Sequence, residues 1–375
     1  MARILAVTWD GGGNVPPMLD IAAELRGRGH EVRVLGHPQQ RDTVEETGLA
    51  FVAYRQDRPW SPLEPASGSR FLSKFLFGVF TDPKAGDDVR DELARLPADL
   101  ALVDSMRLGA LRAALASGVP TAVLMHTLHR YHTHGWSRGP IGAVAALRGM
   151  RPGRLWNAAD RVLVATDRDL DPAAEHHLAG NVRYTGVVQR PVRAGTATEP
   201  PLVLVSLSTI FFDGQAAALQ AILTSLETLP VRAVVTTGAV DPDVVTAPAN
   251  VELHRYLPHD EIMPSASLVV GHGGHATTMR ALAHGLPLLL LPMHPLLDQP
   301  MIAKAVAAAG AARVLPKTAR PEEIRGAISG LLGEGPHRAA AGAIGARIRR
   351  SNGTALATDE LEGLLELRHN ALPQA

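Results

Sequence analysis

The chain contains no cysteine among its 375 residues, which excludes disulfide bonds, thiolate metal ligands and a cysteine nucleophile. It also lacks a net charge, because 37 lysine and arginine residues balance 37 aspartate and glutamate residues. Without an overall field, the chain must bind any anionic ligand through a local site. We therefore expect no nucleic-acid partner.

A long hydrophobic run is missing as well. The longest apolar run lies near Leu286 and is too short to span a bilayer, which predicts a protein with no membrane span. The opening residues, MARILAVTW, contain neither a basic stretch nor a small-residue cleavage site of the kind found in secretory signals. These absences favour a cytoplasmic location, which the lack of cysteine also fits.

The sequence does contain apolar, strand-like segments that alternate with amphipathic, helix-like ones. In the first half the strand-like segments read RILAVTW, RGHEVRVLG, LALVD, TAVLMH and RVLVAT. The pattern stops at residues 187–201, where proline, glycine and threonine predominate, and then restarts. Such alternation is typical of parallel sheets covered by helices on both faces, and the length suits two domains. We predict an α/β fold of two doubly wound domains, residues 1–193 and 200–353, joined by that linker.

Three further segments carry predictions of their own. Residues 354–367 predict a terminal helix, so that residues 354–375 would pack back on the first domain. Residues 56–78 have weak periodicity and predict a long loop over a cleft, in which the phenylalanine-rich part, 71–80, serves either as hydrophobic packing or as a lid over an acceptor. The histidine-rich tract 126–140 would either line an acceptor site or form a surface loop.

The most informative stretch is ASLVVGHGGHATT, residues 266–278, in which glycines follow a predicted strand and precede a predicted helix. Glycine lets the backbone approach a ligand closely, and the free amides at a helix start favour an anion. Thr277 lies in the first turn, where its hydroxyl can donate to a phosphate oxygen. The spacing matches neither a Walker A loop nor GxGxxG, so we predict a pyrophosphate site of another type. A plain tight turn with helix-capping threonines is the alternative.

Histidines are dense in the same region, which raises the question of zinc. His272 and His275 are three residues apart, and His284 and His294 follow. This spacing lacks a further ligand at helical period, so we expect no metal site and instead a phosphate contact by His272.

The stretch GHGGHATTMRALAHGLPLLLLPM, with Asp298 and Gln299 beyond it, resembles the nucleotide-sugar-binding motif of the family 1 glycosyltransferases of GT-B fold. The likeness is greatest to the actinobacterial enzymes of natural-product and antibiotic biosynthesis. The opening RILAVTWDGGGNVPPMLDIAAELRGRGHEVRVLG resembles the start of the same family, and the likeness is weakest at residues 56–96. The resemblance implies two Rossmann-like domains facing a central cleft, the first binding an acceptor and the second a nucleotide-diphosphate sugar.

The resemblance also implies a donor site built from strand ends and helix starts of the second domain. The residues of that site are Ser208, Thr209, Gly238, Leu257, His272, Gly273, Gly274, Thr277, Asp298 and Gln299. The turn at His272 would hold the diphosphate, and the Asp298–Gln299 pair would hydrogen-bond the hydroxyls of the donor sugar. Leu257 would offer its backbone to the base.

One position departs from the family pattern. Members place a histidine after the first strand to deprotonate the acceptor hydroxyl, and an aspartate at a later strand end to orient it. Here the histidine position falls on Asn14, which accepts no proton at neutral pH, whereas Asp104 occupies the aspartate position. Asn14 would position an acidic acceptor while Asp104 or water takes the proton, or Asp10 would act as base, or His126 would. The remaining explanation is a relative that binds without turnover.

The resemblance, taken with these features, implies an inverting, metal-independent glycosyltransferase of the hexosyltransferase type. It would move a sugar or deoxysugar from a UDP- or dTDP-sugar to a hydroxyl of a small aromatic or polyketide-like acceptor, with the nucleotide sugar as co-substrate and no separate cofactor. The alternative is a catalytically silent, nucleotide-sugar-binding partner of a biosynthetic glycosyltransferase. A nucleotide-sugar epimerase fits less well, because the sequence lacks a carboxylate-rich cleft. The sugar, the acceptor, linkage through O, N or C, and homodimer formation stay open.

Overall fold

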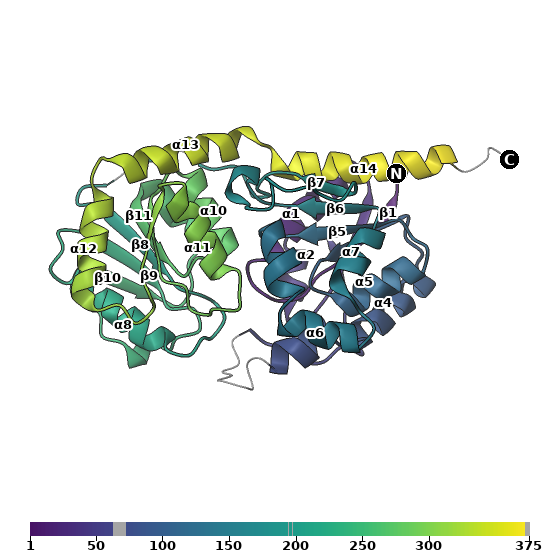
Figure 1. Cartoon of the computed structure of the whole chain (residues 1–375), viewed down its shortest axis with the longest axis horizontal. Coiled ribbons are helices and arrows are strands. Elements are labelled where there is room, and N and C mark those ends of the chain that lie inside the picture. Colours follow the sequence, from purple (N-terminus) through teal and green to yellow (C-terminus); the bar gives the residue numbers. More distant parts are fainter. Residues whose placement is uncertain (63–72, 194, 197, 372–375) are drawn as a thin grey trace. The chain divides into compact units, whose positions relative to one another are not determined.

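The computed structural model describes residues 1–62, 73–193, 195–196 and 198–371, and the chain divides into two compact units. The first unit takes in residues 1–61, the described part of 69–189, and the chain from Asn352 onward. Arg190–Ser351, together with Pro62, forms the second unit (Figure 1). The chain therefore leaves the first unit and returns to it with its last helix.

The first unit is built on a parallel sheet with the strand order β3–β2–β1–β4–β5–β6–β7. Its strands are β1 (Arg3–Val7), β2 (Glu31–Gly36), β3 (Ala50–Ala53), β4 (Leu100–Asp104), β5 (Thr121–Met125), β6 (Arg161–Val164) and β7 (Val182–Tyr184). Its α-helices are α1 (Val15–Gly27), α2 (Arg41–Glu45), α4 (Lys84–Arg95), α5 (Leu108–Ala116), α6 (Pro140–Leu147), α7 (Pro152–Ala158) and α14 (Gly353–Ala371). Short 3-10 and π helices complete the unit: η1 (Pro38–Gln40), η2 (Lys74–Phe80), η3 (Tyr131–Trp136) and η4 (Arg168–Leu170).

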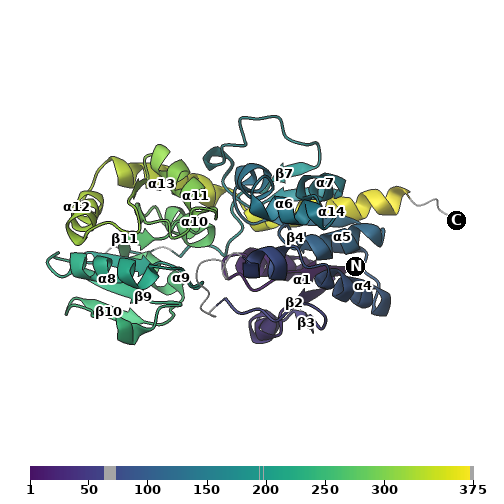
Figure 2. The same cartoon turned by 60° about the horizontal axis from the view of Figure 1, so that its bottom comes forward.

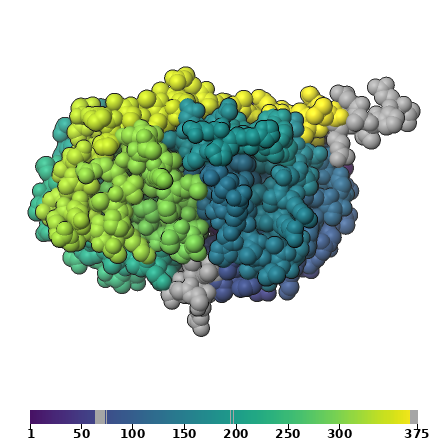
Figure 3. All heavy atoms as spheres, in the orientation of Figure 1, coloured from purple at the N-terminus to yellow at the C-terminus, as the bar shows by residue number. Residues whose placement is uncertain are grey.

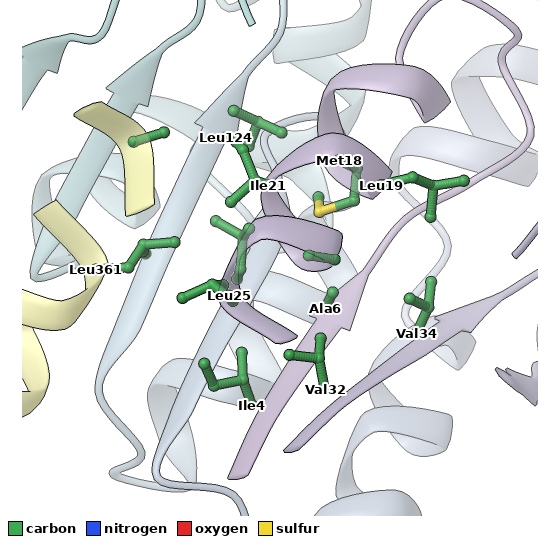
Figure 4. Close-up of a cluster of buried hydrophobic side chains, with 14 of the residues drawn as sticks. Ile4, Ala6, Met18, Leu19, Ile21, Leu25, Val32, Val34, Leu124 and Leu361 are labelled. Carbon is green, nitrogen blue, oxygen red and sulfur yellow. The ribbon is translucent and has the colours of Figure 1, made fainter. Parts of the chain in front are cut away.

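Helices cover both faces of this sheet (Figure 1 and Figure 2), so its central strands are almost wholly apolar and buried. On one face, Met18, Ile21 and Leu25 of α1 point toward the side chains of Ile4 and Leu124 (Figure 4). Their spacing of three and four residues puts them on one side of the helix. The opposite face carries α5, which packs on α4.

The C-terminal helix α14 is part of this core. Ala357, Leu361 and Leu364 of α14 are buried in the same cluster as the residues of α1. Figure 3 shows the yellow atoms of α14 lying against the first unit. Arg28, the C-cap residue of α1, also pairs with Asp359 and Glu362 on the exposed side of α14.

The second unit repeats the arrangement on a parallel sheet with the order β10–β9–β8–β11–β12–β13. Its strands are β8 (Leu202–Ser206), β9 (Arg232–Thr236), β10 (Val251–His254), β11 (Ala266–Gly271), β12 (Leu288–Leu290) and β13 (Ala312–Val314). Its helices are α8 (Gln215–Leu226), α9 (His259–Ile262), α10 (His275–Ala283), α11 (Gln299–Ala308), α12 (Pro321–Leu332) and α13 (Pro336–Arg350), with short η5 (Pro242–Val244) and η6 (Met263–Ser265). The prediction of two doubly wound parallel sheets is confirmed.

Both strand orders contain a point at which the winding reverses. In the first sheet β1 leads to β2 on one side and β4 leads to β5 on the other; in the second sheet β8 and β11 diverge in the same way. Loops that diverge at the carboxyl ends of parallel strands leave a crevice that ligands occupy. The loop after β1 and the turn after β11 lie at these two points of reversal.

Two predictions about irregular segments need correction. The long loop predicted over residues 56–78 ends earlier than expected, because 74–80 forms the π-helix η2, while 63–72 lie outside the described residues. The tract 126–140 is not a surface loop, because η3 buries Tyr131, His132 and Trp136. Among the described residues, no helix combines the length and apolar character needed to cross a bilayer.

Candidate active site

The predicted phosphate site lies at the carboxyl end of β11, where the chain turns into α10. Gly273 has φ +82°, and a Cβ there would lie 2.9 Å from the carbonyl oxygen of Gln299. At the N-cap Gly274, a Cβ would lie 2.8 Å from Cε1 of the His272 ring. The amide of Thr278 donates to the Gly274 carbonyl (3.1 Å), so the amides before it in the first turn have no acceptor within the helix. The turn can therefore present N–H groups and a positive dipole end to an anion.

The imidazole of His272 packs against this turn and is neutral at pH 7. Burial, with a smaller contribution from His259, lowers the pKa of His272 to about 4. The Nδ1 atom of His272 is buried and makes no hydrogen bond within the described part of the chain. A neutral imidazole carries one N–H, which can donate to a phosphate oxygen without adding a charge. An anion at this turn would therefore be bound by N–H dipoles and not by a positive charge on His272.

Gln299 begins α11 and closes the loop that follows β12. Its Oε1 accepts hydrogen bonds from the backbone N–H groups of Met293 (2.7 Å) and His294 (3.2 Å), and the residue is 3% exposed. The carbonyl end of the side chain therefore holds the loop, and the NH₂ group is the end suited to a sugar hydroxyl. Asp298 occupies the N-cap position of α11, is partly exposed and makes no capping hydrogen bond. This makes the capping alternative for Asp298 the weaker one.

The other predicted donor residues follow β8, β9 and β10. The backbone of Gly238, at φ +59°, approaches the Ser208 carbonyl so closely that a Cβ would clash, and the Gly238 N–H donates to the Arg255 carbonyl (3.0 Å). Thr209 is exposed, and Leu257 is half-buried in the turn after β10. The structure thus places all ten predicted donor residues at one edge of the second sheet.

Lys317 is a residue at this edge that the sequence did not single out. Its Nζ donates to the carbonyls of Asp213 (2.7 Å) and Met293 (3.1 Å). The ammonium group thus ties the loop after β8 to the loop after β12. The surrounding sequence VLPKTA carries no signal for this role, because the contact joins three segments that are distant in the chain.

In the first unit, Asn14 occupies the loop after β1 with its amide fully engaged. Its Oδ1 accepts from the Gly11 N–H (3.0 Å), and its Nδ2 donates to the Trp9 carbonyl (2.9 Å) and to Oδ2 of Asp104 (2.9 Å). The residue is only 2% exposed. An amide that is buried and bonded in this way ties the loop to the end of β4 and has no atom left to position an acceptor.

Asp104 ends β4 and is 1% exposed. Its Oδ1 accepts from the Met106 N–H (2.9 Å), and its Oδ2 lies 3.5 Å from Nδ1 of His126 as well as beside the Asn14 amide. His126 follows β5, the strand next to β4, and its side chain is 11% exposed although Nδ1 is buried. The structure therefore groups Asn14, Asp104 and His126 on the β4–β5 side of the loop.

Asp10 lies on the other side of the same loop. Its Oδ2 accepts from Nε2 of Gln39 (3.1 Å), and its backbone N–H donates to Nδ1 of His37 (3.2 Å). Burial raises the pKa of Asp10, against the opposing effects of Gln39 and His37. The structure thus places Asp10 with residues that follow β2, apart from the group around Asp104.

Aromatic side chains pack around this loop. Trp9 contacts Phe75 and Phe80 at ring-centroid distances of 6.3 and 5.3 Å, and Phe80 contacts Trp136 at 5.5 Å. Phe75 and Phe80 are buried and serve as packing, whereas Phe77 between them is 41% exposed. Nearby, His132 is fully buried with its Nε2 2.8 Å from the Ser105 hydroxyl.

No group of three or more histidine, aspartate and glutamate side chains suited to hold a metal ion occurs in residues 1–62 and 73–371, apart from positions 194 and 197.

Two protein families match the chain. The family described as erythromycin biosynthesis protein CIII-like, C-terminal domain, matches residues 220–353. The glycosyl transferase 4-like domain matches residues 12–187. Together these matches include the group around Asp104 and the turn at His272.

Full-length relatives agree with these families. The chain is 28% identical to 4'-demethylrebeccamycin synthase of Lentzea aerocolonigenes, over 97% of this chain and 100% of that protein. It is 25% identical to demethyllactenocin mycarosyltransferase of Streptomyces fradiae, over 97% of this chain and 87% of that protein.

Solved structures share the fold. The glycotransferase of kitacinnamycin matches with a TM-score of 0.77 at 23% identity, over 97% of this chain and 99% of that one. The glycosyltransferase VinC, solved in complex with dTDP, matches with a TM-score of 0.73 at 19% identity, over 97% of this chain and 100% of that one. The family matches, the relatives and the shared fold agree: the chain has the GT-B fold and is similar to glycosyltransferases of natural-product biosynthesis.

Proposed function

We propose that the chain transfers a sugar from a UDP- or dTDP-sugar to a hydroxyl of a small natural-product acceptor, with inversion at the anomeric carbon and without a bound metal. The second unit would hold the donor, and the first unit would hold the acceptor. The relatives named for rebeccamycin and lactenocin support an aromatic or polyketide-like acceptor, and the dTDP complex of VinC supports a nucleoside diphosphate as the donor's leaving part.

The turn from β11 into α10 is the observation on which this proposal rests. Gly273 and Gly274 let the turn pack closely against Gln299 and the His272 ring, and the first-turn amides of α10 together with the Thr277 hydroxyl offer hydrogen bonds to a diphosphate. Asp298 and the NH₂ group of Gln299 would contact the sugar hydroxyls, and Leu257 would contact the base through its backbone.

These groups would also stabilise the products. In a displacement with inversion, the acceptor oxygen bonds to the anomeric carbon while the bond from that carbon to the diphosphate oxygen breaks. The leaving diphosphate then carries additional negative charge, which fixed N–H dipoles at a helix start stabilise without reorganisation. Helix dipoles and hydrogen bonds would thus stabilise the charge of the leaving diphosphate, as a divalent cation does in other transferases.

A pair of glycine substitutions tests the donor site. Gly274→Ala places a methyl group against the His272 ring and distorts the turn, whereas Gly326→Ala adds a methyl group to α12 with no atom within 4 Å. We expect wild type and Gly326→Ala to bind UDP or dTDP in calorimetry, and Gly274→Ala to bind at least about tenfold more weakly, the factor that corresponds to about 1.4 kcal/mol. Equal binding by both variants, or no heat from wild type with either nucleotide, would contradict the proposal.

A catalytically silent, donor-binding partner is the second candidate, because Asn14 stands where the family places its base and is locked inside the loop. Product analysis of wild type with UDP-glucose or dTDP-glucose and a panel of aromatic acceptors separates the two. A transferase forms glycoside, and Asp298→Ala should lower that rate. A silent partner binds the nucleotide, yet neither forms glycoside nor hydrolyses the donor.

A further inference from the structure

We infer that the base missing at Asn14 is supplied from the neighbouring strand: His126, oriented by Asp104, removes the proton from the acceptor hydroxyl. This inference rests on the proposed function, and it deepens that proposal by naming the catalytic residue. In this arrangement Asn14 has a structural role: it holds the loop after β1 and donates a hydrogen bond to Oδ2 of Asp104.

The strand order brings the three residues together. β1, β4 and β5 are adjacent, and residues Asp104 and Leu124 are paired across β4 and β5. His126 therefore follows β5 just beyond the level at which Asp104 ends β4. A base that reached Asp104 from the loop after β1 in relatives can reach it here from the loop after β5.

Geometry separates His126 from the other candidates. Its Nδ1 is buried 3.5 Å from Oδ2 of Asp104, and its side chain retains 11% exposure. Asp104 itself is enclosed: Oδ1 accepts from the Met106 N–H, and Oδ2 accepts from the Asn14 amide and lies 3.5 Å from Nδ1 of His126, which makes no hydrogen bond within the described residues. Asp10 is held by Gln39 on the β2 side. Among these candidates, His126 lies next to a buried carboxylate and also keeps an exposed surface that an acceptor could reach.

The charges facing His126 fit a base. An ionised carboxylate accepts hydrogen bonds only, so it favours the tautomer with the proton on Nδ1 and leaves the lone pair on Nε2. The acceptor proton would move to Nε2 as the oxygen bonds to the anomeric carbon, and Asp104 would stabilise the imidazolium that forms. The other ring near His126 is His132, at 6.2 Å between centroids, which is buried beside the Ser105 hydroxyl.

Nitrogen NMR of histidine-labelled protein tests the pairing without donor or acceptor. The His126→Asn spectrum identifies the His126 signals by their loss. We expect neutral His126 to carry its proton on Nδ1 in wild type, and Asp104→Asn to abolish that preference. A proton on Nε2 in wild type, or a His126 signal that Asp104→Asn leaves unchanged, would overturn the pairing.

Acceptor acidity tests the catalytic step. Phenol needs a base, whereas pentafluorophenol is already ionised at neutral pH. We expect His126→Asn to lower kcat with phenol by about 10²- to 10⁴-fold and to change kcat with pentafluorophenol far less. Asp104→Asn should lower kcat with phenol and leave KM for the donor unchanged. The matched control is His177→Asn, an exposed histidine of the same unit, which should match wild type.

The outcomes separate this inference from the proposed function. If wild type glycosylates phenols and His126→Asn keeps its rate with phenol, or loses rate equally with both phenols, His126 is not the base. If wild type forms no glycoside from any acceptor of an aromatic panel while NMR finds the proton on Nδ1, the proposed function fails and the Asp104–His126 pairing stands. Nucleotide binding by each variant, measured by calorimetry, verifies that the second unit is intact.

Discussion

At the scale of single residues, the surroundings of His272 determine its charge. The ring lies against the Gly274 backbone, and burial lowers its pKa to about 4. A cationic histidine would attract a diphosphate through its charge. A neutral histidine binds through a directional hydrogen bond, since its single N–H has to point at an oxygen. The turn therefore suits a ligand whose two phosphoryl groups are spaced to meet fixed N–H groups.

The lowered pKa makes stability depend on pH. His272 stays neutral in the folded chain but takes up a proton below about pH 6.5 when unfolded, so folding should lose stability as pH falls from about 6.5 towards 4. Between pH 7 and pH 5 the loss from this group amounts to roughly 2 kcal/mol. We expect His272→Gln to reduce the pH dependence of the free energy of unfolding by about that amount, as measured by urea unfolding at the two pH values. His177→Gln should keep the wild-type dependence, and equal slopes for wild type and His272→Gln would contradict the expected effect.

Residues differ in how far sequence alone can place them. Gly273 and Gly274 could be predicted, because a strand, a glycine pair and a helix start are consecutive in the chain. The bonding of Asn14 could not, since three of its partners lie in the loop and the fourth, Asp104, is ninety positions away. The role proposed for His126 depends on the same long-range neighbour.

At the scale of elements, Lys317 connects two loops of the donor edge. A hydrogen bond from a charged donor contributes about 1.5–3 kcal/mol, which is more than a neutral donor contributes. We expect Lys317→Met to loosen the loops after β8 and β12 and to weaken UDP or dTDP binding several-fold in calorimetry, roughly three- to tenfold. Lys304→Met, at an exposed position of α11, is the control and should bind as wild type does. Unchanged affinity in Lys317→Met would show that the loops hold their shape without it.

Regular elements were easier to predict than irregular ones. Helix α8 (Gln215–Leu226) can be predicted from the sequence, because apolar residues recur there at helical spacing. The π-helices η2 and η3 escaped prediction, because five-residue hydrogen bonding has no apolar period of its own and depends on packing. Both π-helices contribute aromatic side chains to the cluster around Trp9, which explains how packing stabilises them.

At the scale of the whole molecule, the last helix stabilises the unit that contains the first strand. Leu361 of α14 is fully buried in the core shared with α1, whereas Leu367 on the same helix is 61% exposed. We expect Leu361→Ala to destabilise the first unit by about 2–5 kcal/mol and Leu367→Ala by well under 1 kcal/mol, as measured by urea or thermal unfolding. Similar unfolding of the two variants would mean that α14 contributes little to the core.

The architecture could be predicted at this scale because the alternation of strands and helices repeats twice, with a break between the repeats. The packing of α14 on α1 could not be predicted from periodicity, since an amphipathic pattern predicts a helix but does not identify the surface on which that helix packs. Its burial against α1 depends on Ala357, Leu361 and Leu364 meeting a matching apolar face more than three hundred residues earlier.

Because the polypeptide exits at Gln189 and re-enters at Asn352, the second unit is, apart from Pro62, one continuous segment in the described part of the chain, whereas the first is assembled from separate lengths of chain. Chimeric proteins that exchange one unit therefore need a different design for each unit. Exchanging the portion that recognises nucleotide sugars requires one continuous cassette with two splice points, while exchanging the acceptor portion requires the terminal helix of the new parent to be transplanted with it.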